Sequence, residues 1–515
     1  MVKMRFAVSF CILFMGILLI KSVVQSEHAF AQPPGWAPRA RIPGSHDLAP
    51  TPWLVEDSSG TIHAFLAQGY RDDDKASETA IFYARWTLGE GWSNLIDVIL
   101  PPFGDHLSIL GVVADEQGMA HLAFISGQGE TSKVFYSNAP LIQAGYAKAW
   151  LPPVEIDDAL GYVGGALAGD GKRFLGIMYS QDGSSIVQAT SLDRGETWST
   201  PTPVLPISAE DRFAYGIRLF TDVDGIVHAV WTENSLSGTG RAIFYARLAP
   251  DDQAWSEPHL LAKAPDFEER MDGQLSNRVE FPSIVKHENS VIVLYTVCDP
   301  CEKRMQFLPD GGQWEGPFVP FDSRGSYGFS DGFVEDAGGK LHLLLVDRAR
   351  GNNLWHAMSL GGSWGMFDPV VPQVAANLAG SKKGEEEGYQ PYDIRAISSR
   401  GNILLVTWTQ DPGFEDNGAW YSYQVLDIAP LPSVTLPEHP PLGVTRALAP
   451  SLSVSATEVV PLPTTSLQPI LIPARALPPP PQSSNVAEAL MVGVVPTGLL
   501  IGLIVGGFLW IRRRR

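Results

Sequence analysis

The chain contains 515 residues and carries a formal net charge of −19 at pH 7, with 50 glycines and 10% aromatic residues. Such an acidic chain is repelled by the phosphates of nucleic acids and by anionic lipid surfaces, so the composition argues against both as partners. The plentiful glycine and aromatic residues agree with a large globular domain that is rich in turns.

The first 31 residues predict an export signal. Lys3 and Arg5 precede an apolar run at 6–20, and small residues suited to cleavage follow at 29–31. This order is typical of a secretory signal peptide, with an uncleaved membrane anchor as the alternative. We therefore expect the domain that follows to lie outside the cell.

Between residues 48 and 428, one sequence unit of about 55 residues occurs seven times. Its first half is an apolar strand, a turn rich in glycine and aspartate, and an alternating strand, as at 53–57, Gly60 and 61–65. An aromatic strand follows, nearly identical at 81–85 and 243–247, and a short turn then leads to a fourth strand that begins at tryptophan. The tryptophans are Trp92, Trp150, Trp198, Trp255, Trp314 and Trp364. Period-two alternation between such turns indicates antiparallel strands.

The two ends of the repeat region complement each other. The seventh unit has three strands and stops at Asp427 without a fourth, whereas residues 35–43 match the pattern of 198–206 and look like a fourth strand without a sheet. Unpaired strand edges are a liability in all-β proteins. We therefore predict an all-β domain over 32–428, a β-propeller of seven four-stranded blades in which the N-terminal strand closes the last blade. Six blades with one aberrant unit are the alternative.

One turn in the third unit carries a specific motif. Ser191, Asp193, Gly195, Thr197 and Trp198 form the pattern S-x-D-x-G-x-T-W, which resembles the Asp-box of the sialidase-type β-propellers. The motif indicates a folding device, because its aspartate can accept backbone N–H groups within the turn while its tryptophan packs between strands. Degraded forms of the motif occur at 251–255, 310–314 and 359–364.

The lengths of the connections distinguish two faces of the expected ring. The turns between strands one and two and between strands three and four are short, and strand geometry puts both on one face. The other connections are long and charged, and they share the opposite face, which we call the loop-rich face. They cover residues 68–78, 233–241, 263–280, 321–327, 347–350, 380–395 and 410–417. A polar face built from loops over a rigid ring is expected to be the binding face.

Two further sets of residues are interpreted as structural. His63, His121, His228 and His342 occupy the same place in different units, and equivalent positions away from the axis of a ring cannot meet at one ion. No metal site and no cofactor are therefore expected. Cys298 and Cys301 form a C-x-x-C pair, for which a local disulfide is predicted because the domain is expected outside the cell.

The resemblance to sialidases implies candidate active-site residues. That family grips a substrate carboxylate with three arginines, uses a tyrosine paired with a glutamate as nucleophile, and uses an aspartate as acid/base catalyst. Arg218, Arg278 and Arg395 lie at first strands of units four, five and seven and are candidates for substrate binding. Asp73 follows the second strand of the first unit and is the candidate acid/base, and Tyr327 precedes unit six and is the candidate nucleophile.

The C-terminal part of the chain predicts a tether to a membrane. Residues 429–486 are rich in proline and predict an extended, semi-rigid extracellular stalk. The uncharged run at 489–511 predicts one transmembrane helix, bounded at 487–511, and the four arginines at 512–515 place the C-terminus in the cytoplasm. Gly498, Gly502 and Gly506 share one face of that helix and suggest a weak homodimer. A cell-wall sorting signal at 495–498 is an alternative.

Two functions therefore stay open for this sequence. One is a cell-surface, membrane-anchored, sialidase-like propeller that recognises extracellular glycans or partner proteins through its loop-rich face. The other is an active exo-sialidase-type glycoside hydrolase that uses the arginine clamp. The sequence leaves undecided whether the protein is an enzyme, because the motif with the strongest match specifies a fold.

Overall fold

The computed structural model describes residues 35–434. Within this range the segments outside the description are 47–48, 71–77, 104–105, 128–130, 160–163, 182–183, 253, 266–276, 299–300, 322–330, 348–352, 361–363, 371–390 and 411–417. The predicted signal peptide, the stalk from 435 onward, the transmembrane helix with its three glycines, and the arginine tail all lie outside the described residues. In the described part, no helix is long and apolar enough to cross a membrane.

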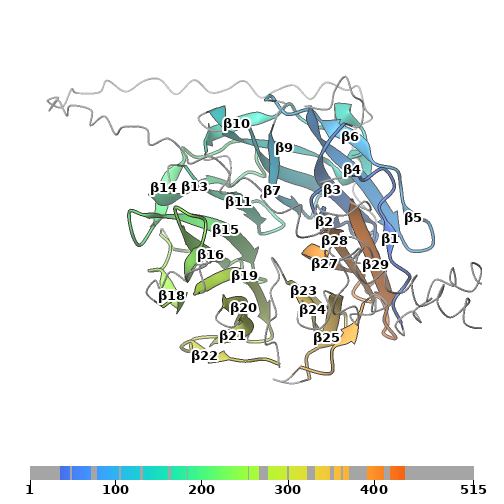
Figure 1. Ribbon diagram of the computed structural model, residues 1–515. Coiled ribbons are helices and arrows are strands. Elements are labelled where there is room, and N and C mark those ends of the chain that lie inside the picture. The colour runs from blue at the N-terminus through green and yellow to red at the C-terminus, as the bar shows by residue number, and fades with distance from the viewer. Residues whose placement is uncertain are drawn as a thin grey trace, which may run out of the picture. The chain divides into compact units, whose positions relative to one another are not determined.

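The described chain forms seven antiparallel sheets arranged as blades around a ring (Figure 1). Blade 1 consists of β2 (Trp53–Glu56), β3 (Ile62–Gly69), β4 (Thr79–Thr87), β5 (Gly91–Trp92) and β6 (Ile96–Ile99). Blade 2 consists of β7 (Leu107–Ala114), β8 (Met119–Ser126), β9 (Lys133–Pro140) and β10 (Val154–Asp158). Blade 3 consists of β11 (Gly165–Gly169), β12 (Leu175–Ser180), β13 (Ser185–Ser191) and β14 (Thr202–Pro206). Blades 4 and 5 consist of β15 (Arg212–Thr221), β16 (Val227–Ser235), β17 (Gly240–Leu248) and β18 (His259–Lys263); and β19 (Arg278–His287), β20 (Ser290–Cys298), β21 (Glu302–Pro309) and β22 (Glu315–Phe318). Blades 6 and 7 consist of β23 (Gly332–Glu335), β24 (Leu341–Asp347), β25 (Asn353–Met358) and β26 (Asp368–Pro369); and β27 (Pro391–Ser399), β28 (Ile403–Gln410), β29 (Ala419–Val425) and β1 (Ala40–Arg41).

The predicted closure of the ring is confirmed. Strand β1 pairs antiparallel with β29, the last strand of blade 7, so that Ala40 lies opposite Tyr421. The pairing extends beyond β1, because the N–H of Ala37 donates to the carbonyl of Tyr423 at 2.7 Å and the N–H of Ile42 donates to that of Ala419 at 2.8 Å. The ring therefore has seven blades, and its first and last segments share one sheet.

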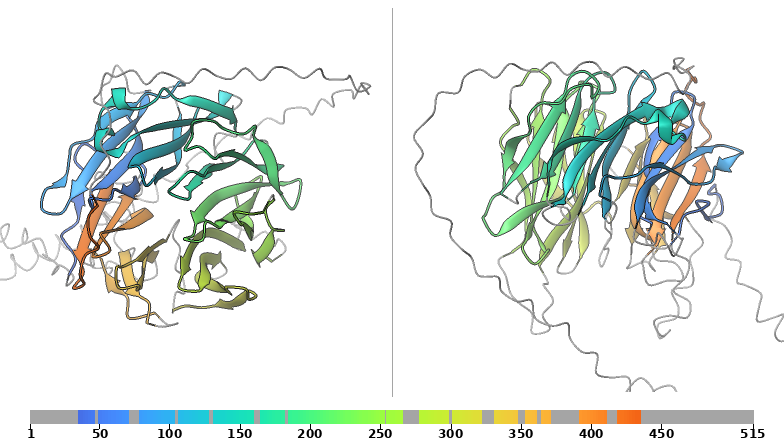
Figure 2. Two further views of the ribbon diagram at one scale, coloured as in Figure 1. Left: turned by 180° about the vertical axis from the view of Figure 1, so that it is seen from behind. Right: turned by 90° about the horizontal axis from the view of Figure 1, so that it is seen from above.

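The hydrophobic core is divided among the interfaces between neighbouring blades, which stand face to face around the ring (Figure 2). Between blades 4 and 5, for example, Tyr245 packs against Val291 and Tyr295 in one cluster of buried side chains. Burying a large apolar side chain contributes about 1.5–3 kcal/mol. Because each blade packs against two neighbours, the interfaces hold the inner strands at fixed positions around the axis.

The predicted start of the outer strands at tryptophan is wrong in several blades. The outer strands of blades 2, 3 and 4 begin at Val154, Thr202 and His259, each four residues after its tryptophan. The tryptophan packs on the neighbouring blade, as Trp198 does on Tyr136 with ring centroids 4.9 Å apart. Since the indole is used in the blade interface, the chain pairs with the third strand only after it has turned.

The chain that follows β29 crosses to blade 1 on the face that carries the short turns. We call residues 426–434 the post-ring segment. The N–H of Leu431 donates to the carbonyl of Arg400, in the first turn of blade 7, at 2.8 Å, and the N–H of Val434 donates to that of Ser58, in the first turn of blade 1, at 2.7 Å. The hydroxyl of Ser58 returns a bond to the carbonyl of Val434 at 3.0 Å. This segment therefore bridges the two blades at which the ring closes.

Candidate functional site

Arg395 lies on β27, the inner strand of blade 7, at the junction with blade 1. Its guanidinium carbon is 3.8 Å from the centroid of the Trp53 ring, and Nη1 donates to the carbonyl of Thr51. Asp393 Oδ2 is 3.9 Å from Nη2. Burial lowers the pKa of Arg395 to about 10; Asp393 opposes this shift and the charge of Arg218 adds to it. Arg395 is therefore a largely desolvated cation at pH 7.

Arg218 lies on β15, the inner strand of blade 4, and its charge acts on Arg395. Blades 4 and 7 are not neighbours in the ring, so this interaction passes through the centre. Among the residues that the structure describes, no hydrogen-bond or ion-pair partner is found for the half-buried Arg218 side chain. A partly desolvated guanidinium without a carboxylate partner favours an incoming anion.

A β-bulge explains how Tyr215 and Arg218 serve the same region. Residues three apart on a regular strand point to opposite faces, but the register of β15 shifts between Tyr215 and Arg218. Gly216, within the bulge, has a positive φ of 60°. The extra residue restores a common direction, and bulges are frequent next to functional sites for this reason.

Arg278 is the first residue of β19, and it already has an acidic neighbour. Its Nε is 3.3 Å from Oε2 of Glu280 on the same strand. Burial raises the pKa of Glu280, while Arg278 and a hydrogen bond from the N–H of Gly240 oppose the rise. Arg278 is therefore linked to the centre of the ring through Glu280.

Five residues from three inner strands form what we call the axial cluster: Tyr215, Arg218, Glu280, Asp393 and Arg395. Burial raises the pKa of Tyr215, Arg218 lowers it, and Asp393 and Glu280 add to the rise. The side chain of Tyr215 is nonetheless 38% exposed. Figure 1 shows β15, β19 and β27 beside the centre of the ring. The cluster combines two cations, two carboxylates and an accessible phenol.

The sequence-predicted residues are distributed unevenly around this cluster. Arg218 and Arg395 share one electrostatic environment, and Arg278 joins through Glu280. The candidate acid/base Asp73 and candidate nucleophile Tyr327 lie outside the described residues. Sequence reasoning missed Tyr215, Glu280 and Asp393, although all three occupy first strands within three residues of a predicted arginine.

The Asp-box turn makes a closed set of internal hydrogen bonds. Oδ1 of Asp193 accepts from the N–H of Thr197 at 2.9 Å and Oδ2 accepts from its hydroxyl at 2.6 Å. Oγ of Ser191 accepts from the N–H of Gly195 at 2.7 Å. Trp198 packs on Tyr136 of the neighbouring blade. These groups are used in the turn and at the blade interface.

The repeated histidines each bridge groups within their own blade. Nδ1 of His63 lies 2.8 Å from the hydroxyl of Tyr83 and Nε2 lies 3.1 Å from Oδ2 of Asp57. The corresponding chains are Asp115–His121–Tyr136, Asp222–His228–Tyr245 and Asp336–His342–His356. Over the described ranges, no group of three or more His, Cys, Asp or Glu side chains could hold a metal ion.

Cys298 and Cys301 are joined by a disulfide in the structure. Cys298 ends β20 directly opposite Arg278 in the register of blade 5. The bond therefore closes the connection from β20 to β21 beside the strand that supplies Arg278 and Glu280.

Comparison with solved structures finds proteins of similar fold. The BP39L lectin from Burkholderia pseudomallei is 12% identical, with a TM-score of 0.51 over 76% of this chain and 99% of the lectin. The NanB sialidase from Streptococcus pneumoniae is 13% identical, with a TM-score of 0.42 over 76% of this chain and 71% of the sialidase. The arabinofuranosidase Arb93A from Fusarium graminearum is 11% identical, with a TM-score of 0.41 over 76% of this chain and 98% of the arabinofuranosidase. No protein-family model and no curated protein sequence matches the chain.

Of these three structures, only the lectin exceeds a TM-score of 0.5, and at 12% identity it establishes a shared fold alone. The chain is thus a seven-bladed β-propeller. A mixed-charge cluster, the axial cluster, lies on the inner strands of its ring.

Proposed function

We propose that this protein is a cell-surface propeller that binds an anionic extracellular glycan at the axial cluster without chemical turnover. The observation that carries the proposal is the pair Arg218 and Arg395: the charge of Arg218 acts on Arg395 from a blade that is not its neighbour, and Arg218 has no hydrogen-bond or ion-pair partner in the described part of the chain. A guanidinium matches a carboxylate or sulfate group through paired hydrogen bonds.

The rest of the cluster suits a sugar that carries such an anionic group. Asp393 and Glu280 supply acceptors for hydroxyl groups, and the accessible Tyr215 supplies an aromatic surface and one more hydroxyl. Trp53 stacks on Arg395 and so holds its guanidinium in one orientation. Preorganised groups lose little entropy on binding. The fold shared with a protein named as a lectin agrees with this ligand class.

An exo-sialidase-type glycoside hydrolase is the second candidate. The specific observation in its favour is that Tyr215 lies within the electrostatic influence of Glu280 and Arg218. A tyrosine beside a carboxylate can attack an anionic sugar without charge repulsion. In this second proposal, Tyr215 joins Tyr327 as a candidate nucleophile.

Two assays on the same protein samples separate the candidates. We expect the protein to be retained on an array of sialylated, uronic-acid-containing and sulfated glycans. We expect it to release no fluorophore from a fluorogenic sialoside. Arg218→Ala and Arg395→Ala should each weaken retention by about tenfold or more, since each removes a charged hydrogen-bond donor. Arg400→Ala, in a turn on the opposite face, is the matched control and should bind normally.

Release of the fluorophore, abolished by Tyr215→Phe, would replace the binding proposal with the enzymatic one. Neither retention nor release, in protein that unfolds cooperatively on heating, would contradict both. Retention that survives Arg218→Ala and Arg395→Ala together would place the glycan elsewhere on the molecule.

The proposed location rests on the predicted signal at 1–31 and the predicted helix at 487–511. We expect protease added to intact cells to remove the propeller, and a C-terminal tag after Arg515 to be protected. A tag that is digested along with the propeller would contradict the proposed topology.

A further inference from the structure

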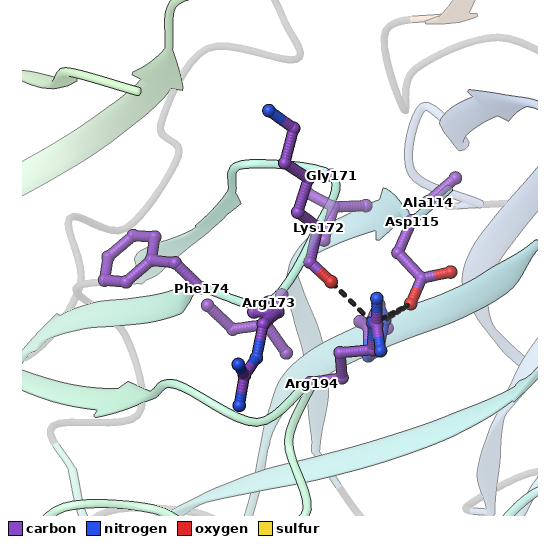
Figure 3. A pocket seen from close by; sticks show the side chains of 10 residues that line it. Ala114, Asp115, Gly171, Lys172, Arg173, Phe174 and Arg194 are labelled. Carbon is purple, nitrogen blue, oxygen red and sulfur yellow. Dashed lines mark hydrogen bonds and ion pairs between the residues drawn. The ribbon is translucent and has the colours of Figure 1, made fainter. Parts of the chain in front are cut away.

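The junctions between neighbouring blades differ in what fills them on the face with the short turns. At the junction of blades 2 and 3, Arg194 of the Asp-box turn lies over Asp115, with Nε 3.5 Å from Oδ2 (Figure 3). Its Nη2 is 3.1 Å from Oε1 of Glu116, and its Nε donates to the carbonyl of Lys172 at 2.5 Å. The space left is about 10 Å³, roughly one water molecule.

The corresponding junction of blades 4 and 5 is open. The turn after β21 has no arginine; Pro309 and Asp310 are followed by Gly311 and Gly312. A cavity of about 270 Å³ lies between the two blades, lined by Ile226, His228, Arg247, Lys286, Val291, Leu308 and the turn 309–312. A Cβ added to Gly311 would meet nothing within 4 Å. Two glycines in place of an arginine-bearing turn therefore leave room for a small molecule.

Two polar groups of this cavity, Lys286 and Asp310, are held in place by ion pairs. Nζ of Lys286, which is 11% exposed, is 3.2 Å from Asp222, 3.1 Å from Asp310 and 3.6 Å from Asp224. These ion pairs fix the carboxylate of Asp310, which is still 52% exposed. Arg247, an exposed residue, also lines the cavity, and no hydrogen-bond or ion-pair partner for its guanidinium is found in the described residues.

The charges at this cavity nearly cancel. The cations Lys286 and Arg247 and the carboxylate of Asp310 line the cavity, and the carboxylates of Asp222 and Asp224 pair with Lys286 beside it, which gives these five groups a net charge of −1. Burial lowers the pKa of His228, so its ring is neutral at pH 7. A near-neutral cavity that offers both donors and acceptors suits a neutral, hydrogen-bonding ligand better than an ion.

We propose that the cavity between blades 4 and 5 is a second ligand site, distinct from the axial cluster, for a neutral polyhydroxylated molecule of monosaccharide size. Arg247 donates hydrogen bonds to ligand hydroxyl groups and Asp310 accepts them. The aliphatic side chains of Val291 and Leu308 cover the C–H face of the ring. The volume is slightly below the ~300–1,000 Å³ of pockets for drug-sized ligands, as a single sugar ring requires.

The test measures binding of D-glucose, D-galactose, D-mannose, L-fucose and N-acetyl-D-glucosamine to the full-length protein by saturation-transfer NMR and calorimetry. At least one of them should bind. Asp310→Asn and Arg247→Gln should each weaken that binding by about tenfold, because each removes hydrogen bonds to a charged group. Arg218→Ala, in the axial cluster, should leave it unchanged.

A matched pair of variants at Gly311 tests the cavity itself. Gly311 has a φ of +67°, close to the +62° that Arg194 adopts in the intact motif. Gly311→Arg should fill the cavity and abolish binding, whereas Gly311→Ala carries the same backbone strain and should retain it.

Three results would overturn this second site: no monosaccharide of the panel binds, binding survives Gly311→Arg, or binding is lost in Arg218→Ala. Should Gly311→Arg fail to fold, Asp310→Asn and Arg247→Gln decide alone. The axial proposal is judged separately, since Gly311→Arg should leave binding of anionic glycans intact.

Discussion

At the scale of single residues, blade 6 differs from three other blades in one side chain of its third strand, which is half-buried. In blades 1, 2 and 4 the histidine of the second strand bonds to a tyrosine on the third strand, whereas His342 of blade 6 faces His356 at 2.9 Å. His356 also packs edge-on against Trp36 of the ring-closing segment, with ring centroids 5.4 Å apart. An imidazole thus replaces a phenol beside the segment that closes the ring.

His356 should make the folded state sensitive to acid. Burial, together with the charge of His342, lowers the pKa of His356 to about 3. Between pH about 6.5 and about 3 the unfolded chain binds a proton that the folded chain excludes, so stability falls as the pH falls through this window. His356→Tyr should flatten the decline in melting temperature between pH about 7 and about 4 without removing it, since other buried groups also titrate.

The histidine prediction has an internal control. Above pH about 6.5 the ring is neutral in both states, so its contribution no longer varies with pH. If the melting temperatures of the wild-type protein and His356→Tyr fall in parallel as the pH is lowered, then His356 does not cause the loss of stability in acid.

The glycine of the Asp-box is expected to be irreplaceable for two separate reasons. Gly195 has a φ of +82°, and an added Cβ would lie 2.0 Å from the hydroxyl of Tyr136. Gly171 has a φ of +70°, but a Cβ there would meet nothing. Gly171→Ala should cost about 1–2 kcal/mol of unfolding free energy through backbone strain alone. Gly195→Ala should cost clearly more, because a buried ring must also move.

Urea denaturation of the two alanine variants, with the wild-type protein alongside, checks the comparison. Equal losses in the two variants would mean that the contact with Tyr136 adds nothing. The Asp-box would then be specified by its backbone conformation alone.

At the scale of elements, the closing strand is short, with Ala40 half-buried and Arg41 exposed, and the residue that follows it is fully buried. Strand β1 pairs only Ala40 and Arg41 by regular register, yet the next residue, Ile42, is 0% exposed and belongs to the cluster shared by blades 7 and 1. Ile42→Ala should therefore reduce the free energy of unfolding by roughly 2–5 kcal/mol. Leu192→Ala, at a side chain that is 69% exposed, should change it by less than about 0.5 kcal/mol.

Chemical denaturation measures both changes. If Ile42→Ala lowers the free energy of unfolding no more than Leu192→Ala does, then burial of Ile42 between blades 7 and 1 contributes little to stability. Ring closure would then depend on the backbone pairing with β29.

The bulges on inner strands explain why only part of the candidate site could be predicted. The sequence predicts Arg218, Arg278 and Arg395 as site residues because they lie at first strands, and the first strand of each blade faces the axis in any propeller. Tyr215 is not predicted, because strict alternation puts it on the face opposite Arg218, and the register shift that reverses this leaves only Gly216 as a signal. Trp53 was recognised as the start of a strand, but its stacking on Arg395 depends on blade 7.

At the scale of the whole molecule, the fold itself was readable because it is built from local repeats. Seven units with hairpin turns, one of them lacking a strand and one strand lacking a sheet, admit few arrangements. Outer-strand boundaries were misplaced at Trp150 and Trp198, because a tryptophan looks the same whether it starts a strand or packs on the next blade. Contacts between blades depend on side-chain geometry that the repeat pattern does not contain.

The post-ring segment should contribute measurably to stability. Truncation after Asp427 removes the backbone bonds of Leu431 and Val434 to the turns of blades 7 and 1, each of which contributes about 0.5–1.5 kcal/mol. A chain that ends at Asp427 should melt several degrees below one that ends at Val434, by about 2–4 °C for each kcal/mol lost. Identical melting temperatures would show that the segment rests on the ring without stabilising it.

Because the segment is bonded to both Arg400 and Ser58, tension on the chain beyond Val434 is not delivered to β29 directly. The tension acts first on the hydrogen bonds to blade 1, then on the hydrogen bond to blade 7, and only afterwards on β29. These two attachments must therefore break before a pulling force can separate β29 from the rest of the ring.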